Sequence, residues 1–341
     1  MQDESICHDE RFSTTRLLFR GQVSSNAGSK LNGEGNASAP VAKAIKREGG
    51  LRTKGFSKQD VSKKPLVTVI TVVFNGAQRL EDTIRSVLNQ SYDNVEYIVI
   101  DGGSTDGTLE LIGKFGDAID YWVSEPDRGI YDAMNKGLDA ASGEWVNFMN
   151  AGDAFCSKQS IANTVREFSG AMVYYSDAIF YFERGRHCYY RQVPCDAKSY
   201  RFIHQSCIYR KQLHSIHGKY IVAKGITASD YLFFKSVPYE RWQKTKSVIS
   251  KYYVGDNVSS GERHCEQVYG TDLLFGNRSV SKTFVVYWLE AMKRRIRNAE
   301  KSILGRNLYS ICVEKYAKVR REKFWQDALD VVEEANQRSI E

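Results

Sequence analysis

A regular alternation of apolar runs and amphipathic stretches between residues 66 and 149 constrains the fold more than any other feature. The run LVTVITVVF, residues 66–74, is typical of a strand buried on both faces. The stretch that follows carries apolar residues at helical spacing, namely Leu80, Ile84, Val87 and Leu88. Because strands that alternate with helices build parallel sheets, the sequence predicts an α/β fold with a mostly parallel central sheet and helices on both faces.

The alternation continues and then loosens. Three more strands and two more helices are expected up to residue 149, over 95–100, 109–115, 119–125, 130–142 and 145–149. Beyond Asp153 we expect a helix over 158–168 and one or two strands over 171–183, followed by mixed elements rich in aromatic residues. We therefore place one domain at 64–262, with a first half at 64–155 and a second half at 156–262.

The two ends of the chain differ from this domain. Residues 1–63 include a stretch rich in Gly, Ser and Asn with little to bury, so they are expected to be disordered or weakly ordered. Residues 263–341 are expected to form a basic, helical region. From about Lys282 apolar residues recur in steps of four and three, and the segment from Lys293 to Lys323 has eleven Lys and Arg against three Glu.

The charge is therefore local. The chain carries +7 in total, so the part outside the basic segment is close to neutral. A neutral main domain argues against a nucleic-acid groove, whereas a basic amphipathic helix suits an anionic surface. No run of 18 apolar residues is present and the first residues are charged, so we expect no membrane span and no signal peptide, and a cytoplasmic location.

Polar loops follow three of the expected strands. They start at Phe74, Asn75 and Gly76, at Asp101 to Ser104, and at Asn150 to Asp153. Ligands of open parallel sheets bind outside the carboxyl ends of the strands. No glycine-rich phosphate loop is present, so the nucleotide fingerprints of that kind are excluded. Asp101 could accept hydrogen bonds from a base or a ribose, and Asp153 could anchor a divalent cation that takes its other ligands from a diphosphate.

These strings together resemble the family-two inverting glycosyltransferases, in particular the bacterial branch that builds O-antigen, capsule and exopolysaccharide. The most specific are DGGSTDGT, residues 101–108, and PDRGIYDAMNKG, residues 126–137. The resemblance is strong from Val67 to Phe155, weaker to Ser260, and absent from residues 1–63 and the C-terminal helix. It implies the nucleotide-diphosphate-sugar transferase fold called GT-A, a cytosolic enzyme, a nucleotide-sugar donor and a divalent cation, Mg²⁺ or Mn²⁺.

The resemblance also implies roles for individual residues. Asp153 occupies the family's metal motif, although Asn150 and Gly152 stand where many members have carboxylates, which puts strict metal dependence in doubt. The general base corresponds to Asp230 in the Ser229-Asp230 pair; from the residues alone, a helix cap is the alternative. The set implied to bind the nucleotide sugar is Phe74, Asn75, Asp101, Gly103, Ser104, Arg128, Asn150 and His204. A surface ion pair for Arg128 and a structural role for His204 are the alternatives.

The sequence thus predicts an inverting transfer of a sugar to a hydroxyl of a lipid-linked glycan in cell-surface polysaccharide synthesis. The rivals are a sugar nucleotidyltransferase, which would need a phosphate loop that FNGAQRL does not supply, a non-catalytic nucleotide-sugar-binding scaffold, and a nucleic-acid binder suggested by charge alone. The basic C-terminal helix is expected to attach the enzyme peripherally to the cytoplasmic face of the inner membrane, with plain packing on the domain as the alternative.

Overall fold

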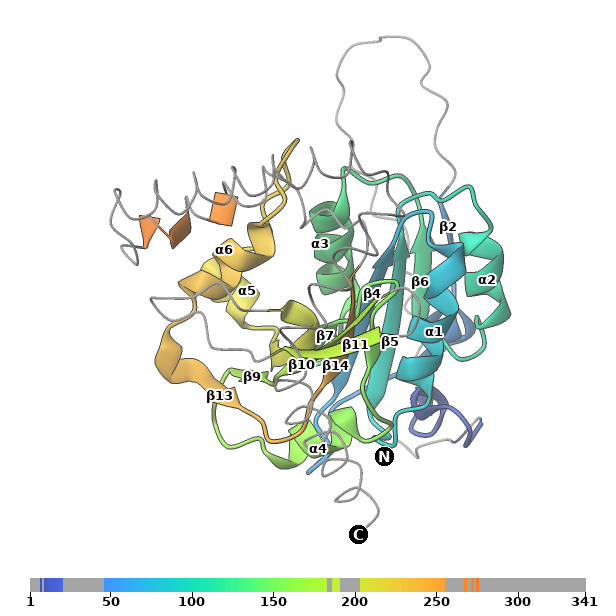
Figure 1. The fold of residues 1–341 in the computed structure, drawn as a ribbon. Helices are drawn as coiled ribbons and strands as arrows, with labels where there is room; N and C mark the ends of the chain where they lie inside the picture. Colours follow the sequence, from blue (N-terminus) through green and yellow to red (C-terminus); the bar gives the residue numbers. More distant parts are fainter. Residues whose placement is uncertain are drawn as a thin grey trace, which may run out of the picture.

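The computed structural model describes residues 7, 9–20, 46–182, 203–254, the backbone of 186–190, and the short pieces 267–268, 271–272 and 274–275. A main sheet and its helices occupy the centre of the molecule (Figure 1). The strands of the main sheet are β2 (Arg47–Gly49), β4 (Val67–Val73), β5 (Val95–Asp101), β6 (Tyr121–Ser124), β7 (Trp145–Phe148), β9 (Val173–Tyr175), β12 (Cys207–Arg210) and β13 (Trp242–Lys244). The helices are α1 (Ala77–Leu88), α2 (Thr108–Lys114), α3 (Ile130–Ala140), α4 (Ser160–Arg166), α5 (Leu213–His217) and α6 (Ser229–Ser236).

The main sheet has the order β13-β9-β12-β7-β4-β5-β6-β2. Neighbours β4, β5, β6 and β7 are parallel, whereas β12 and β2 each run antiparallel to the strands beside them. In the β4–β5 register Val73 lies opposite Asp101, and in the β5–β6 register Asp101 lies opposite Ser124. The strand ends are therefore level, which gathers the loops that follow them at one edge. The prediction of a mostly parallel α/β sheet is confirmed.

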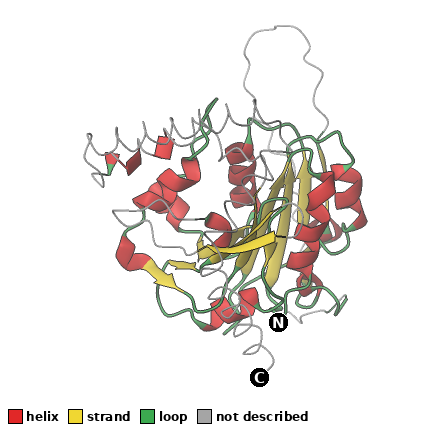
Figure 2. Ribbon diagram, in the orientation of Figure 1, coloured by secondary structure: helices red, strands yellow, loops and turns green. Residues whose placement is uncertain are grey.

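Both faces of the sheet are covered, because every residue of β4 and β5 is buried. Alternate side chains such as Ile70 and Ile98 pack with Met134 of α3 in one core. The intervening ones, such as Val69, pack with Leu80 of α1 in a second core. Helices accordingly flank the strands on both sides (Figure 2). Each such fully buried aliphatic side chain contributes roughly 1.5–3 kcal/mol to folding.

A second, smaller sheet closes over the second half of the domain. Its order is β11-β10-β14-β8, formed by β8 (Ala154–Phe155), β10 (Ala178–Phe182), β11 (Arg186–Tyr190) and β14 (Ser250–Val254). Strand β8 comes directly after the Asn150–Asp153 loop, and β14 pairs antiparallel with it. The loop that ends β7 is thus the junction between the two sheets, which brings residues from both halves of the domain to it.

Part of the N-terminal extension belongs to the fold, so the prediction of disorder or weak order does not hold for the described residues 9–20 and 46–63. Strand β2 adds an antiparallel edge to the main sheet beside β6, and η2 (Leu51–Lys54) follows it. Further upstream, η1 (Ser13–Thr15) is buried and β1 (Phe19–Arg20) pairs with β3 (Phe56–Ser57). The physical reason is the buried Leu51 side chain together with the ion pair from Arg52 to Glu96 of β5. Residues 21–45 lie outside the described residues.

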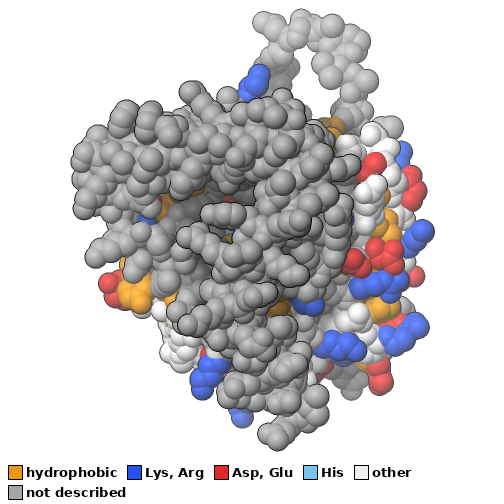
Figure 3. Space-filling view, viewed as in Figure 1, with side chains coloured by type: hydrophobic (Ala, Val, Ile, Leu, Met, Phe, Trp, Pro, Cys, Tyr) orange, Lys and Arg blue, Asp and Glu red, His pale blue; other side chains and the backbone are white. Residues whose placement is uncertain are grey.

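Two further expectations fall partly or wholly outside what the structure describes. The basic helix expected from 282 to 323 lies outside the described residues. Within the described part, no helix is both long enough and apolar enough to cross a bilayer. On the described surface at the right of Figure 3, basic and acidic side chains are intermixed.

Candidate active site at the carboxyl edge of the sheet

The loops after β4 and β5 are bonded to each other. Asn75, at φ 50°, donates its backbone N–H to Ser104 Oγ at 2.7 Å, and its side-chain Oδ1 accepts the N–H of Thr105 at 2.9 Å. Asp106 accepts the backbone N–H of Ala77 at the first turn of α1 and that of Thr108 at the start of α2, both at 3.1 Å. These hydrogen bonds join two loops that are far apart in the sequence into one surface, here called the ledge, on which a flat ligand could lie.

Asp101 supports this ledge from below. Its side chain is fully buried and accepts hydrogen bonds from the backbone and hydroxyl of Ser104 and from the Ser124 hydroxyl at 2.6 Å. Gly103, two residues after Asp101, has φ 85°, a conformation that glycine adopts without strain. Gly103 and Ser104 are partly exposed in this loop, and the carboxylate of Asp101 fixes the position of Ser104.

The loop after β7 is fixed by helix α1. Thr83 of α1 accepts the N–H of Gly152 at 3.0 Å and donates its hydroxyl to the carbonyl of Asp153 at 2.7 Å. Gly152 has φ 100°, so the turn requires glycine. Below it, the Asn150 amide nitrogen lies 3.2 Å from His204 Nε2, while the buried Asn150 Oδ1 has no partner among the described residues. The residues at 150–153 thus form a turn with defined bonds and one unsatisfied amide oxygen.

The Asp153 carboxylate joins the two sheets. Its side chain is buried; Oδ1 accepts the backbone N–H of Tyr253 in β14 and Oδ2 accepts the Gln205 amide, both at 2.8 Å. Burial raises the pKa of Asp153 to about 7, although the bonds from Tyr253 and Gln205 and the nearby His204 act in the opposite direction. A carboxyl group in this environment resists ionisation at neutral pH.

This arrangement does not fit a metal ligand. A ligating carboxylate must be ionised and must face the cation, whereas Asp153 is 5% exposed with a protein donor on each oxygen. Among the residues that the structure describes, no three His, Cys, Asp or Glu side chains gather closely enough to hold a metal ion. The divalent cation stays a prediction, and no step of the chemistry below is routed through it.

A second set of polar residues converges on Asp230, at the start of α6. Tyr131 of α3 donates its hydroxyl to Asp230 Oδ1 at 2.6 Å. His204 of η3 (His204–Ser206) lies with Nδ1 2.7 Å from Asp230 Oδ2. The Asp230 side chain keeps 21% of its surface exposed. This carboxylate is held by two donors from two other elements and is still open to solvent, as a general base needs to be.

The contacts of Ser229 and of the residues before α6 bear on the alternative that the Ser229-Asp230 pair is a helix cap. Ser229 Oγ accepts the backbone N–H of Ile221 at 2.6 Å, and α6 has no side-chain cap bond at its N-cap, Ala228. Gln267 instead accepts the N–H groups of Thr227 and Ala228. The Asp230 side chain is directed to Tyr131 and His204.

The remaining predicted residues lie at the rim. Phe74 is 65% exposed beside Asn75. Arg128 is 75% exposed and pairs at 2.7 Å with Asp132, four residues further on. An ion pair of this kind was the alternative to a donor-binding role that the sequence left open for Arg128. The sequence reasoning did not single out Tyr131, although it lies within the specific PDRGIYDAMNKG string. It likewise gave no role to Thr83 or Tyr253, because no local sequence pattern identifies a residue that bonds to a loop 70 or 100 positions away.

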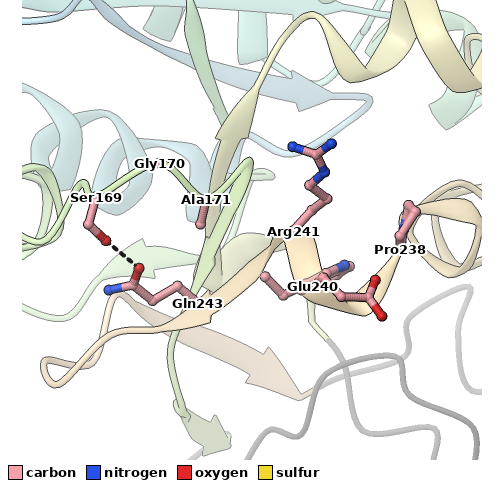
Figure 4. Close-up of a pocket in the computed structure, with 8 residues that line it drawn as sticks. Ser169, Gly170, Ala171, Pro238, Glu240, Arg241 and Gln243 are labelled. Atoms are coloured by element: carbon pink, nitrogen blue, oxygen red, sulfur yellow. Dashed lines mark hydrogen bonds between the residues drawn. The ribbon is translucent and has the colours of Figure 1, made fainter.

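The described part of the chain also has a hollow at the opposite edge of the main sheet (Figure 4). Its walls come from the turn before β9 and from η4 (Tyr239–Arg241) and β13, with Ser169 bonded to Gln243 at 2.6 Å. The full lining is Ser169, Gly170, Ala171, Pro238, Glu240, Arg241, Trp242 and Gln243. None of the predicted site residues lines it, so the chemistry is placed at the carboxyl edge.

Comparison with known proteins agrees with this geometry. Residues 68–225, which contain β4, all three carboxyl-edge loops and His204, match the model for glycosyl transferase family 2. This part of the chain is therefore similar to glycosyl transferase family 2. Asp230 lies just beyond the matched residues.

Two curated relatives and one solved structure illustrate the similarity. An uncharacterized glycosyltransferase of Mycobacterium tuberculosis is 42% identical over 107 residues, 31% of this chain and 41% of that protein. The putative teichuronic acid biosynthesis glycosyltransferase TuaG of Bacillus subtilis is 40% identical over 93 residues, 26% of this chain and 37% of TuaG. The chain thus spans about two fifths of the length of these relatives. The mannosyltransferase PcManGT of Pyrobaculum calidifontis aligns with TM-score 0.52 at 16% identity, covering 81% of this chain and 87% of that one, which supports the GT-A-like fold.

Proposed function

We propose that this protein is an inverting glycosyltransferase that uses a nucleotide-diphosphate-sugar donor. In the proposed step an acceptor hydroxyl attacks the anomeric carbon of the donor sugar. The bond from that carbon to the diphosphate oxygen breaks, the nucleoside diphosphate leaves, and the hydroxyl proton passes to the Asp230 carboxylate. The observation that carries the proposal is this partly exposed carboxylate, oriented by Tyr131 and His204.

The donor is placed on the ledge formed by the loops after β4 and β5. Asn75, Gly103 and Ser104 would meet the nucleotide, Phe74 would cover its base, and Asp101 would act by fixing the loop. Arg128, at the start of α3, would reach the diphosphate if it left Asp132, since its planar fork suits phosphate oxygens. PcManGT, which shares the fold, is described in complex with GDP-Man and Mn²⁺, which supports a nucleotide sugar as the ligand class.

The acceptor is a hydroxyl of a cell-envelope glycan or glycolipid. TuaG is named for teichuronic acid biosynthesis, and that relationship supports a polysaccharide acceptor. A lipid-linked acceptor of the O-antigen or capsule type, and attachment to the inner-membrane surface through residues 282–341, extend the same proposal. Sedimentation with vesicles of increasing anionic-lipid content would test the attachment, which should weaken in high salt and be lost on removing residues 282–341.

A donor screen tests the proposal. The protein is incubated with a panel of nucleotide sugars and a mixed acceptor fraction, and release of nucleoside diphosphate is measured. Asp230→Asn keeps the side-chain size but removes the proton acceptor, so turnover should fall by about a hundredfold or more while donor binding is unchanged. Asp139→Asn, which alters an exposed carboxylate of α3 paired with Lys219, is the matched control and should be fully active.

The screen also separates the alternatives. A non-catalytic scaffold would bind a nucleotide sugar in calorimetry and release nothing from it. A sugar nucleotidyltransferase would release pyrophosphate from a nucleoside triphosphate and a sugar phosphate. Full turnover in Asp230→Asn would contradict the assignment of the base and return Asp230 to a structural role.

A further inference from the structure

We propose that His204 is a positioning residue that orients Asp230 and links it to the loop after β7. This inference rests on the proposed function, since it concerns the group that takes the proton. It goes beyond that function because it assigns to His204 a role toward the base, and not toward the donor. The observation is an unbroken series of side chains, Asn150, His204, Asp230 and Tyr131, contributed by four different segments.

The partners of the imidazole define its protonation. Nδ1 faces a carboxylate oxygen, which can only accept when ionised, so Nδ1 carries the proton and donates it to Asp230. Nε2 then accepts from the Asn150 amide. A neutral ring satisfies both contacts at once. The ring also meets the edge of Phe148 at 89° with centroids 6.4 Å apart, so it cannot turn freely.

The geometry lets His204 fix the orientation of the Asp230 carboxylate. Asp230 lies on α6, in the second half of the domain, whereas the loops that would hold the donor belong to the first half. Tyr131 fixes one carboxylate oxygen from α3 and His204 fixes the other from η3. With both oxygens anchored, the orientation of the carboxylate toward the acceptor is fixed. A displacement of about 1 Å at such a group lowers a rate by up to about a hundredfold.

The same ring connects the base to the turn where the donor sugar would lie. Asn150 lies two residues after the end of β7, and its Oδ1 is buried without a partner among the described residues. A donor hydroxyl is the kind of group that would satisfy this oxygen, because a buried unpaired acceptor is unfavourable. Donor binding would then hold Asn150, which in turn holds His204 and Asp230. The base is in this way oriented by the loop that receives the substrate.

Among the described residues, ionisable groups from several neighbouring elements lie near this series. They are Tyr209 from β12, Tyr220 from the segment after α5 and Asp153 from the β7 loop, besides Tyr131 from α3 within the series. Burial is the main cause that raises the pKa of each tyrosine well above its ordinary value, and Asp230 raises it further. These phenols stay protonated at neutral pH, so they add no change to the rate profile there.

The test compares two substitutions of His204 with one of another buried histidine. His204→Ala should lower kcat by about tenfold to a hundredfold with the donor KM nearly unchanged. The acid limb of its pH–rate profile should move to higher pH, because a carboxylate that loses a donor takes up a proton more readily. His204→Asn places an amide N–H near the position of Nδ1 and should recover most of the rate and the profile. The control is His214→Asn, in α5, where the ring is stacked on Phe233 and bonds Tyr209; it should lower the unfolding temperature only.

A measurement without turnover keeps the inference separate from the proposed function. A proton NMR signal from the imidazole Nδ1–H, shifted downfield by the carboxylate, should be present in the wild type and absent from both His204→Asn and Asp230→Asn. Its absence from the wild type would overturn the inference whatever the activity. Equal losses in His204→Ala and His204→Asn, or an unmoved pH profile, would reduce His204 to packing. A wild type that turns over no donor but shows the signal would contradict the proposed function and leave the pair standing.

Discussion

The two edges of the main sheet both bury carboxylates, but the groups that meet them differ. At the amino edge, Glu96 in β5 is met by Arg52 of η2, whereas Asp120 before β6 lies near the buried Lys58, whose Nζ has no hydrogen-bond partner among the described residues. At the carboxyl edge, Asp101 and Asp153 accept hydrogen bonds from hydroxyls, an amide and a backbone N–H, and Asp230 is met by the Tyr131 hydroxyl and the His204 imidazole. Glu96 is thus compensated by a cation within the fold, whereas neutral donors meet Asp101 and Asp153.

The pKa values of Glu96 and Asp153 shift in opposite directions. Burial raises the pKa of Glu96, but the Arg52 charge and bonds from Ser142 and Thr68 outweigh it and hold the pKa below its ordinary value. Burial raises the pKa of Asp153 to about 7, against the bonds from Tyr253 and Gln205 and the nearby His204. At the amino edge, burial likewise raises the pKa of Asp120 to about 7, although Lys58 lowers it, so a direct ion pair such as Arg52–Glu96, and not the edge alone, decides the direction.

The largest expected effect breaks the amino edge. Arg52→Met leaves Glu96 as a buried charge without its cation and also removes a bond of 2.6 Å to the Ala140 carbonyl. Removing one member of a buried pair destabilises a protein by about 3–5 kcal/mol; the lower end applies because Arg52 is 26% exposed. Urea unfolding measures the change, and turnover of the protein that remains folded should be unaffected.

A neighbouring lysine provides the matched control for Arg52. Lys54, in the same η2 turn, pairs with Asp117, and both side chains are largely exposed. Lys54→Met should therefore lower the free energy of unfolding by less than about 1 kcal/mol. Equal destabilisation by the two substitutions would show that the amino edge does not depend on its internal ion pair, and the comparison between the edges would fail.

The same ion pair shows where sequence reasoning succeeds and where it stops. The strands and helices from β4 to β7 follow from local patterns, because apolar periodicity is a property of consecutive residues. Glu96 inside the apolar run VEYIVI was a usable signal, since a buried carboxylate needs a partner. The identity of that partner, 44 positions away in a segment predicted to be weakly ordered, was not available from any local pattern.

The candidate site divides in the same way. The sequence placed Asn75, Asp101, Asn150, His204 and Asp230 in loops or helix starts, and the parallel topology gathers them at one edge. It could not show that Asp153 faces inward to Gln205 and Tyr253, because its orientation depends on a second sheet whose strands come from distant parts of the chain. A residue type next to a strand end indicates a site, whereas the direction of its side chain is decided by tertiary packing.

The second prediction concerns the pH dependence of stability at Asp153. Its pKa is about 7 in the folded protein and near 4 in an unfolded chain, so between these values the folded state binds the extra proton. Stability from this group is consequently present at low pH and is lost as pH rises toward 7. Asp153→Asn should flatten this slope when unfolding free energies are measured from pH 4.5 to 7.5. Glu96→Gln should leave the slope in this window unchanged, because the pKa of Glu96 is lowered from 4.5 and its pH-dependent contribution falls below that pH.

The same variant sharpens the question of the cation. If Asp153 is a buried link between two sheets, the dependence of turnover on added Mn²⁺ or Mg²⁺ should be the same in Asp153→Asn as in the wild type. Both are stripped with EDTA and titrated with each metal. A half-saturating metal concentration that rises more than about tenfold in the variant, without a matching fall in unfolding temperature, would restore Asp153 as a ligand.

The smallest expected effect concerns Arg128 at the rim of the carboxyl edge. The comparison asks whether its place in the molecule gives it a role that a similar ion pair on α1 does not have. Arg128–Asp132 at the start of α3 and Arg85–Glu81 on α1 are both ion pairs between residues four apart, each at 2.7 Å; both arginines are exposed, whereas Asp132 is 13% exposed. Because both arginines are exposed, Arg128→Ala and Arg85→Ala should leave the unfolding temperature within error of the wild type. Arg128, however, lies in the loop between β6 and α3, at the carboxyl edge. If it supplies the charge that a diphosphate needs, Arg128→Ala should raise the donor KM by about tenfold with kcat little changed, as expected for loss of one charge-assisted contact. Arg85→Ala should leave KM unchanged. Identical donor KM values for the two variants would mean that Arg128 serves only its helix, and that the compensating charge for the diphosphate comes from elsewhere.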